Sequence, residues 1–301
     1  MTTELRIEPV DVVEVGNSLG ESVLWDDRRR TVWWTDIHEK RLYSYDVNTR
    51  ALAQWQTPAR LCSFGLIEDG DSFIAAFDGG IALFDPLNSS LEWLLRPLPQ
   101  GDGLRLNDGR VDRRGRFWVG SMIEPYEEKR LARGTLYCIE RDGRAIEREW
   151  GISISNGLCW SPDGQTLYFA DSPQRVIYAF DMDLDSGRLS GKRVFARTDK
   201  GGYPDGATVD RQGYVWSAHW NAGRIVRYSP RGEVDSILPL PVSQPTCVAF
   251  GGSELDLLIV TSARSSLSQV QLDAQPLAGH LLIYKVNFRG LPEERFRHAA
   301  M

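Results

Sequence analysis

Residues 160–171 read WSPDGQTLYFAD, in which a Ser-Pro-Asp-Gly turn separates an apolar residue from a strand rich in aromatic and β-branched residues. Turn residues between two apolar runs are typical of a β-hairpin. The pattern occurs five more times, as LWDDRRRTVWWTD (24–36), IEDGDSFIAAFD (67–78), VDRRGRFWVGS (111–121), VDRQGYVWSAH (209–219) and FGGSELDLLIVTSA (250–263). The chain therefore contains six copies of one hairpin unit.

The spacing of these hairpins indicates how they assemble. The last apolar residues before the six turns are Trp25, Ile67, Val111, Trp160, Val209 and Phe250. Successive positions in this series are 42, 44, 49, 49 and 41 residues apart. Such steps suit one four-stranded blade of a β-propeller, which takes ~40–50 residues. A third strand follows in every unit, and five units offer a weaker fourth strand.

The sixth unit has little left after Val286 except a polar tail, whereas the N-terminal segment 6–15, RIEPVDVVEV, alternates like a strand. We expect this segment to supply the missing outer strand, because an open ring would leave unpaired strand edges. The prediction is an all-β, six-bladed β-propeller closed by the N-terminal strand, with residues 1–301 forming a single domain. Helices should be nearly absent, and residues 124–134 should form a long loop.

Composition excludes several classes of protein. The 301 residues are 42% hydrophobic and carry a net charge of −6, which excludes a disordered chain and gives no basic surface for nucleic acid. The N-terminus is charged where a signal peptide is apolar, and 18 apolar residues never occur together, so no membrane partner is expected. We expect a cytoplasmic protein whose four widely spaced cysteines are reduced and buried.

The innermost strand of each blade lies beside the propeller axis, so equivalent positions on these strands form a ring. Four residues before the positions used above, every unit has an oxygen-bearing side chain: Glu21, Ser63, Asn107, Asn156, Asp205 and Thr246. Turn chemistry explains an Asn or Asp at any one position, but not Glu21 or six polar residues in one register. Two carboxylates converging on an axis repel each other unless a cation lies between them.

The ring contains no His or Cys, so its oxygen donors suit Ca²⁺, Mg²⁺ or Mn²⁺, although Zn²⁺ and Fe²⁺ also accept carboxylates. Three protein ligands would leave coordination positions open, which distinguishes a catalytic metal from a structural one. The residues alone therefore predict a divalent cation on the propeller axis.

Several motifs resemble those of the regucalcin/gluconolactonase family, the senescence marker protein-like sugar lactonases. They include LGESVLW (19–25), RLNDGRVDRRGRFWVGSM (105–122), ISNGLCWSPDGQTLYFADS (154–172) and PDGATVDRQGYVWSAHWNAGRIVRYSP (204–230). The resemblance runs from about Leu19 to Tyr284 and implies a six-bladed propeller with one divalent cation. The metal ligands it implies are Glu21, Asn156 and Asp205. The substrate-binding residues it implies are Arg105, Asn107 and Glu124. The metal remains open among calcium, zinc, manganese and iron(II).

We therefore predict a metal-dependent hydrolase that opens a sugar lactone to the aldonic acid. The cation would polarise the lactone carbonyl, and Asp205 would act as general base. The alternative is a non-catalytic, calcium-binding regulatory propeller of the regucalcin type. A propeller enzyme of the strictosidine-synthase type is disfavoured, because it gives no reason for two carboxylates at the axis. Pentono- and hexonolactones, and the oligomeric state, remain undecided.

Two further features could suggest other chemistry. Residues 16–20, GNSLG, match the G-x-S-x-G turn of serine hydrolases, but a strand rather than a helix should follow, and no histidine is suitably placed. His219 ends the second strand of the fifth unit, where it would either line the channel or have a structural role, and we favour structure.

Overall fold

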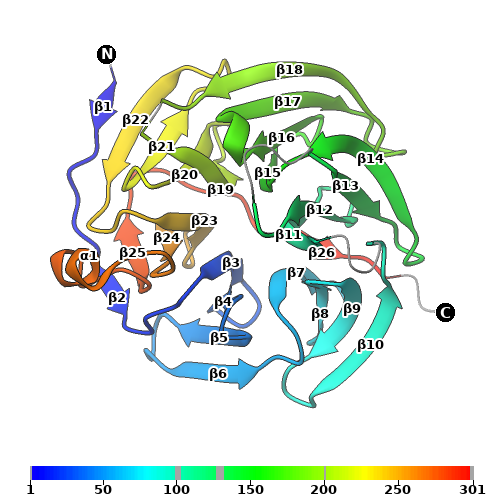
Figure 1. Cartoon of the computed structure of the whole chain (residues 1–301), viewed down its shortest axis with the longest axis horizontal. Coiled ribbons are helices and arrows are strands. Elements are labelled where there is room, and N and C mark those ends of the chain that lie inside the picture. The colour runs from blue at the N-terminus through cyan, green and yellow to red at the C-terminus, as the bar shows by residue number, and fades with distance from the viewer. Residues whose placement is uncertain (1, 99–102, 127–131, 200, 299–301) are drawn as a thin grey trace.

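The computed structural model describes residues 2–98, 103–126, 132–199 and 201–298. Its strands form six sheets that stand around a central axis in chain order (Figure 1). The predicted six-bladed β-propeller is therefore confirmed. No helix in these residues is long and apolar enough to cross a membrane.

Blades 1 to 3 each run outward from the axis in sequence order. Blade 1 contains β3 (Gly20–Asp26), β4 (Thr31–Asp36), β5 (Arg41–Asp46) and β6 (Leu52–Gln56). Blade 2 contains β7 (Leu61–Ile67), β8 (Phe73–Phe77), β9 (Gly80–Asp85) and β10 (Ser90–Leu95). Blade 3 contains β11 (Leu104–Val111), β12 (Phe117–Ile123), β13 (Gly134–Ile139) and β14 (Ala145–Ile152).

Blades 4 to 6 continue the same order. Blade 4 contains β15 (Ser155–Trp160), β16 (Thr166–Asp171), β17 (Val176–Met182) and β18 (Leu189–Arg197). Blade 5 contains β19 (Tyr203–Val209), β20 (Val215–Trp220), β21 (Arg224–Tyr228) and β22 (Val234–Pro239). Blade 6 contains β23 (Pro245–Gly251), β24 (Leu257–Ser262) and β25 (Leu281–Lys285).

The N-terminal segment closes the ring as predicted. Strand β2 (Asp11–Val13) pairs antiparallel with β25, placing Val12 opposite Leu282. The sheet of blade 6 therefore gains its fourth, outer strand from the other end of the chain. The N-terminal segment also makes a pairing that was not predicted, because β1 (Thr3–Glu4) adds to the outer edge of blade 5, parallel to β22.

The apolar core lies between the faces of neighbouring blades. Trp118 of blade 3, for example, is fully buried and meets Trp160 of blade 4 edge-on, with ring centroids 6.1 Å apart. Trp34 and Trp216 occupy similar buried positions on the second strands of blades 1 and 5. The four cysteines are buried free thiols. These aromatic contacts fix each blade against the next and so hold the innermost strands at the axis.

Among the residues that the structure describes, helical structure is confined to two short elements. A 3-10 helix, η1 (Ser172–Gln174), joins β16 to β17, and α1 (Gln269–Ala274) lies between β24 and β25. Helix α1 was not predicted, although Ser268 and Gln271 form a capping box at its start. The predicted loop 124–134 is described only at its two ends, because residues 127–131 lie outside the described residues.

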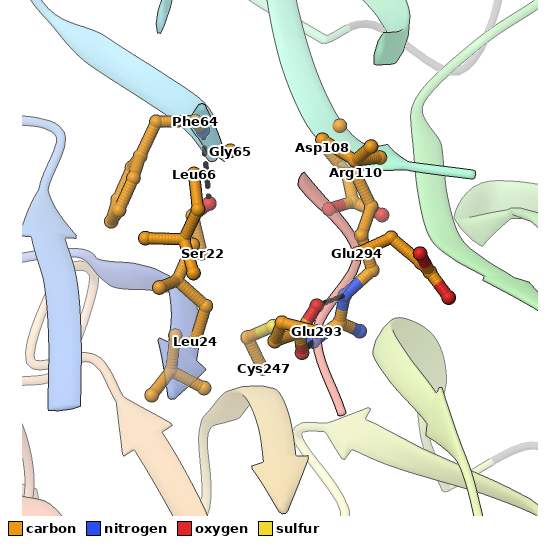
Figure 2. Close-up of a pocket in the computed structure, with 13 residues that line it drawn as sticks. Ser22, Leu24, Phe64, Gly65, Leu66, Asp108, Arg110, Cys247, Glu293 and Glu294 are labelled. Carbon is orange, nitrogen blue, oxygen red and sulfur yellow. Dashed lines mark hydrogen bonds and ion pairs between the residues drawn. The ribbon is translucent and has the colours of Figure 1, made fainter. Parts of the chain in front are cut away.

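The segment after Val286 is more than a polar tail, because it crosses the end of the channel opposite the oxygen ring. Strand β26 (Arg295–Phe296) pairs parallel with the innermost strand β7 of blade 2. Glu293 forms an ion pair with the guanidinium of Arg110 in blade 3 (Figure 2). Its Oε1 lies 2.5 Å from Arg110 Nη2. The cavity beside this ion pair measures about 10 Å³, room for one water at most. A sugar-sized ligand therefore has no room at this end.

This segment also contributes to stability, because Phe296 is fully buried among apolar residues of blades 2 and 3. We expect Phe296→Ala to lower the free energy of unfolding by about 3–5 kcal/mol, the usual cost of emptying a buried phenylalanine site. Chemical denaturation monitored by tryptophan fluorescence measures this loss. Leu87→Ala is the control, since Leu87 is 62% exposed and should change stability by less than about 0.5 kcal/mol. A loss below about 1 kcal/mol for Phe296→Ala would show that the segment is dispensable.

Candidate active site

The innermost strands share an irregularity that sets the direction of the ring side chains. In each of the six, the register against the second strand shifts at or next to the ring residue, for example between Glu21 and Leu24 in β3 and between Asn156 and Cys159 in β15. Such β-bulges insert one extra residue and re-aim side chains next to active sites. The residue after the ring position has a left-handed backbone in two blades, with φ 53° at Ser22 and 64° at Gly157.

Four of the six predicted ring residues line one cavity of about 520 Å³: Glu21, Asn107, Asn156 and Asp205. Arg105 lines it as well. Ser63 and Thr246 do not, and the Thr246 hydroxyl instead donates a hydrogen bond to the Gly20 carbonyl and lies 2.8 Å from the Thr261 hydroxyl. The structure therefore brings together both predicted carboxylates and both amides, while blades 2 and 6 contribute no ring side chain to the cavity.

The two carboxylates of the ring lie in an environment that opposes their ionisation. Burial, with the nearby charge of Asp108 added, raises the pKa of Glu21 to about 8. Burial and the charges of Glu21 and Asp108 raise the pKa of Asp205 well above its usual value. A positive charge between the two side chains would reverse this effect.

The donor atoms fit a hard divalent cation. Glu21 and Asp205 supply carboxylate oxygens, and Asn156 supplies an amide oxygen, in the same cavity. The described residues contain no cluster of three or more His, Cys, Asp and Glu side chains placed to hold a metal, so a third side-chain ligand beside the two carboxylates would have to be of another type, such as the Asn156 amide. Asn156 Oδ1 accepts one hydrogen bond from Asn107 Nδ2 at 3.0 Å and keeps a second lone pair for a cation.

Hydrogen bonds orient both amides. Asn156 Nδ2 donates to the Ser172 hydroxyl at 2.8 Å, which directs its oxygen away from η1. Asn107 Nδ2 donates to the Ser155 carbonyl at 2.8 Å as well as to Asn156. Both N–H groups of Asn107 are therefore used, and its Oδ1, which already accepts from Arg105, can only accept from a ligand hydroxyl.

Arg105 is held by its neighbours so that one end of its guanidinium remains available. Its Nη1 donates to Asn107 Oδ1 at 2.7 Å, and its Nε donates to Glu124 Oε1 at 3.0 Å. Within the described part of the chain, Nη2 donates to no protein oxygen. The guanidinium can therefore offer Nη2 to a ligand in the cavity.

Glu124 lies behind Arg105 rather than on the cavity wall. Its second oxygen accepts from Arg60 Nη1 at 2.6 Å, an arginine of blade 2 that the sequence analysis did not identify. Although burial opposes it, the charges of Arg105 and Arg60 lower the pKa of Glu124. The carboxylate is thus placed to position Arg105, and its predicted contact with substrate stays a prediction.

His219 is buried and is not among the residues that line the cavity. Its Nε2 lies 3.2 Å from the Tyr228 hydroxyl inside blade 5, and burial lowers its pKa to about 3. A neutral imidazole in this position agrees with the structural role that the sequence analysis favoured.

The G-x-S-x-G segment precedes strand β3, as expected, and not a helix. Contrary to expectation, a histidine lies beside it, because Ser18 Oγ is 3.2 Å from His38 Nδ1. The nearby carboxylate of Asp36 accepts from the backbone amides of Ser18 and Leu19 and does not orient the imidazole. The serine triad therefore lacks its third member.

Other residues that line the cavity were not predicted from the sequence. They include Met122, Tyr126, Ser172, Arg175, Tyr203 and Trp220. These residues come from strand ends and loops of blades 3 to 5, and they share no motif. Only their position in the repeat could have indicated them, since Ser172 and Trp220 lie at the ends of second strands next to the ring. Their convergence depends on the curvature of the whole ring.

Comparison with known proteins agrees with this geometry. Residues 19–264 match the family model described as SMP-30/Gluconolactonase/LRE-like region. The 6-deoxy-6-sulfogluconolactonase of Pseudomonas putida is 38% identical over 95% of this chain and 97% of its own length. The L-arabinolactonase of Azospirillum brasilense is 35% identical over 95% of this chain and 94% of its own.

Among solved structures, a calcium-binding protein from Agrobacterium tumefaciens, regucalcin, superimposes with a TM-score of 0.92. It is 29% identical, and the match covers 99% of this chain and all of the other. The family model spans most of the sequence, including every residue of the oxygen ring. With six blades, a closing N-terminal strand and this match, the chain belongs to the SMP-30/gluconolactonase/LRE-like family.

Proposed function

We propose that this protein is a carboxylic ester hydrolase that opens sugar lactones to the corresponding acids, with a divalent cation in its cavity. The observation that carries the proposal is the placement of Glu21, Asn156 and Asp205 beside Arg105 and Asn107 in one cavity of about 520 Å³. The 38% and 35% identical relatives, both named as lactonases, support the reaction. The volume suits a monosaccharide-sized ligand.

Glu21, Asn156 and Asp205 would hold the cation. When bound, it would polarise the lactone carbonyl and stabilise negative charge on the carbonyl oxygen. The Agrobacterium relative, described as calcium-binding, supports a divalent ion of this kind. The same donor set leaves zinc, manganese and iron(II) as alternatives.

Asp205 would move the proton. Its Oδ1 accepts from the Gly206 amide at 3.1 Å, so Oδ2 is the oxygen that receives a proton from the attacking water. The water oxygen bonds to the carbonyl carbon, the bond from that carbon to the ring oxygen breaks, and the proton passes from Asp205 to the released oxygen. A carboxylate within hydrogen-bond reach of the attacking water can take up its proton as a general base.

Arg105 and Asn107 would orient the sugar. Arg105 Nη2 can donate to a sugar oxygen, while Asn107 Oδ1 can only accept from a sugar hydroxyl. The two side chains therefore favour a ligand with neighbouring hydroxyl groups. Glu124 and Arg60 keep Arg105 in this position through their ion pairs.

The alternative is a calcium-binding propeller without catalysis, which the resemblance to regucalcin favours. Titration of acid released from glucono-1,5-lactone, galactono-1,4-lactone and arabinono-1,4-lactone, with Ca²⁺, Mn²⁺ or Zn²⁺ added, separates the two. We expect saturable release of one equivalent of acid from at least one lactone, well above the spontaneous rate. Calcium binding without turnover of any lactone would support the alternative and refute hydrolysis.

A further inference from the structure

We propose that Arg175 makes this cavity selective for sugar lactones with an acidic group on their terminal carbon. This inference rests on the proposed lactonase function and adds the class of substrate. The acidic group would be a sulfonate, phosphate or carboxylate. Its partner would be the guanidinium of Arg175, which lines the same cavity as the oxygen ring.

The charges in the cavity single out Arg175. The charged side chains that line it are Glu21, Arg105, Arg175 and Asp205. Arg105 is neutralised by Glu124 at 3.0 Å, and the two carboxylates suit a cation. Arg175 forms no ion pair with any described residue, and its Nη1 donates only to the backbone carbonyl of Asp199 at 3.0 Å. The carboxylate of Asp199 itself is paired with Arg224.

The free edge of this guanidinium matches an acidic group. With Nη1 directed at a backbone carbonyl, the Nε and Nη2 groups donate to no described protein atom. Two N–H groups side by side fit two oxygens of a carboxylate, sulfonate or phosphate. In a concave site that is partly shielded from water, such a pair is stronger than at an open surface. A neutral sugar would leave this positive charge without a counter-charge.

Arg175 is also held in a defined position relative to the reacting centre. It directly follows η1, whose first residue, Ser172, accepts from Asn156 Nδ2 at 2.8 Å and donates to the Pro204 carbonyl at 2.7 Å. The guanidinium carbon lies 4.3 Å from the centre of the Tyr203 ring, which also lines the cavity. Because these contacts exist before a ligand binds, little side-chain entropy is lost on binding.

The backbone at this position favours glycine. Arg175 has φ 57°, and Gly223, which precedes the third strand of the next blade in the same way, also has φ 57°. Other turn residues of this chain, Lys40 among them, adopt the same left-handed backbone, so the conformation by itself assigns no role to the side chain. Glycine adopts it without strain, which makes Arg175→Gly a variant that removes the side chain without opposing the fold.

The test compares three lactones that differ only at the terminal carbon: glucono-1,5-lactone, 6-phosphoglucono-1,5-lactone and 6-deoxy-6-sulfoglucono-1,5-lactone. We expect the wild-type protein to prefer at least one acidic lactone by tenfold or more in kcat/KM. Arg175→Gly should lower this acidic-to-neutral ratio about 10-fold to 100-fold, mainly through KM, as expected for one charge-assisted contact. Arg175→Lys, which keeps the charge but not the two-pronged geometry, should retain part of the preference.

Lys40→Gly is the matched control. Lys40 is basic, has φ 53° and precedes the third strand of blade 1, but it does not line the cavity. Its replacement should leave the ratio unchanged. A wild-type ratio near one, or a ratio that survives Arg175→Gly, overturns the inference while lactone hydrolysis stands. If the wild-type protein hydrolyses none of the three lactones and none of the earlier panel, the proposed function fails, and this inference fails with it.

Discussion

Asp205→Asn is expected to lower kcat/KM for lactone hydrolysis at least about thousandfold. The substitution keeps the size of the side chain but removes the proposed base, and general-base catalysis alone contributes about 10²–10⁴-fold. It also removes one of two anionic ligands from the cavity. The initial rate of acid release at saturating metal measures the effect. Thermal unfolding shows whether the variant is folded.

Asp108→Asn is the matched control for this experiment. Asp108 lies next to the ring on β11 and influences the pKa of Asp205, but it faces the opposite end of the channel and does not line the cavity. Its Oδ2 accepts from the Leu158 amide at 2.9 Å, a bond that an asparagine oxygen can keep. We expect less than a tenfold change in kcat/KM. Retention of more than a tenth of wild-type activity by Asp205→Asn would exclude Asp205 as the base.

Removal of divalent cations should abolish at least about 99% of the activity. Without a cation, burial and mutual repulsion oppose the ionised forms of Glu21 and Asp205, which raises the pKa of both groups. The experiment is dialysis against a chelator, followed by addition of Ca²⁺, Mn²⁺, Zn²⁺ or Fe²⁺ one at a time. At least one ion should restore the rate of acid release, and the ion that restores the highest rate is the preferred metal.

Thermal unfolding gives a second measure of the same site. A cation that binds only the folded chain stabilises it by about 2.7 kcal/mol at a concentration 100 times its Kd. The Tm of the depleted protein should therefore rise when the metal is added back. In Glu21→Gln, which has lost a carboxylate ligand, this rise should be much smaller. If the chelator changes neither the activity nor the Tm, the proposed metal site is ruled out.

The fold could be predicted from local patterns, because each hairpin contains residues that favour its turn. WSPDGQTLYFAD became the β15–β16 hairpin, and the period of the hairpins gave the number of blades. Strand β26 could not be predicted, because two residues have no periodicity and their partners in β7 lie more than 200 positions earlier. Helix α1 was missed although its capping box is visible in the sequence.

Part of the candidate site could also be predicted from the repeat. Asn156 and Asp205 occupy the same register position in consecutive repeats, so the repeat itself predicted that they would face one axis, and the cavity contains both. The ion pair of Glu124 with Arg60 joins blades 3 and 2 across 64 positions of sequence. No local pattern predicts such a pair, because it depends on how two blades pack.

The sequence by itself determined the repeat, the number of blades, the closing strand and which side chains stand at the level of the ring. Turn residues and strand alternation act over a few residues, so they can be recognised without the rest of the chain. Only the tertiary structure decided that Ser63 and Thr246 stay out of the cavity, that Glu124 lies behind Arg105, and that Arg175 lines the same cavity as the ring. Those outcomes depend on bulges, on the angle between blades and on hydrogen bonds between distant segments.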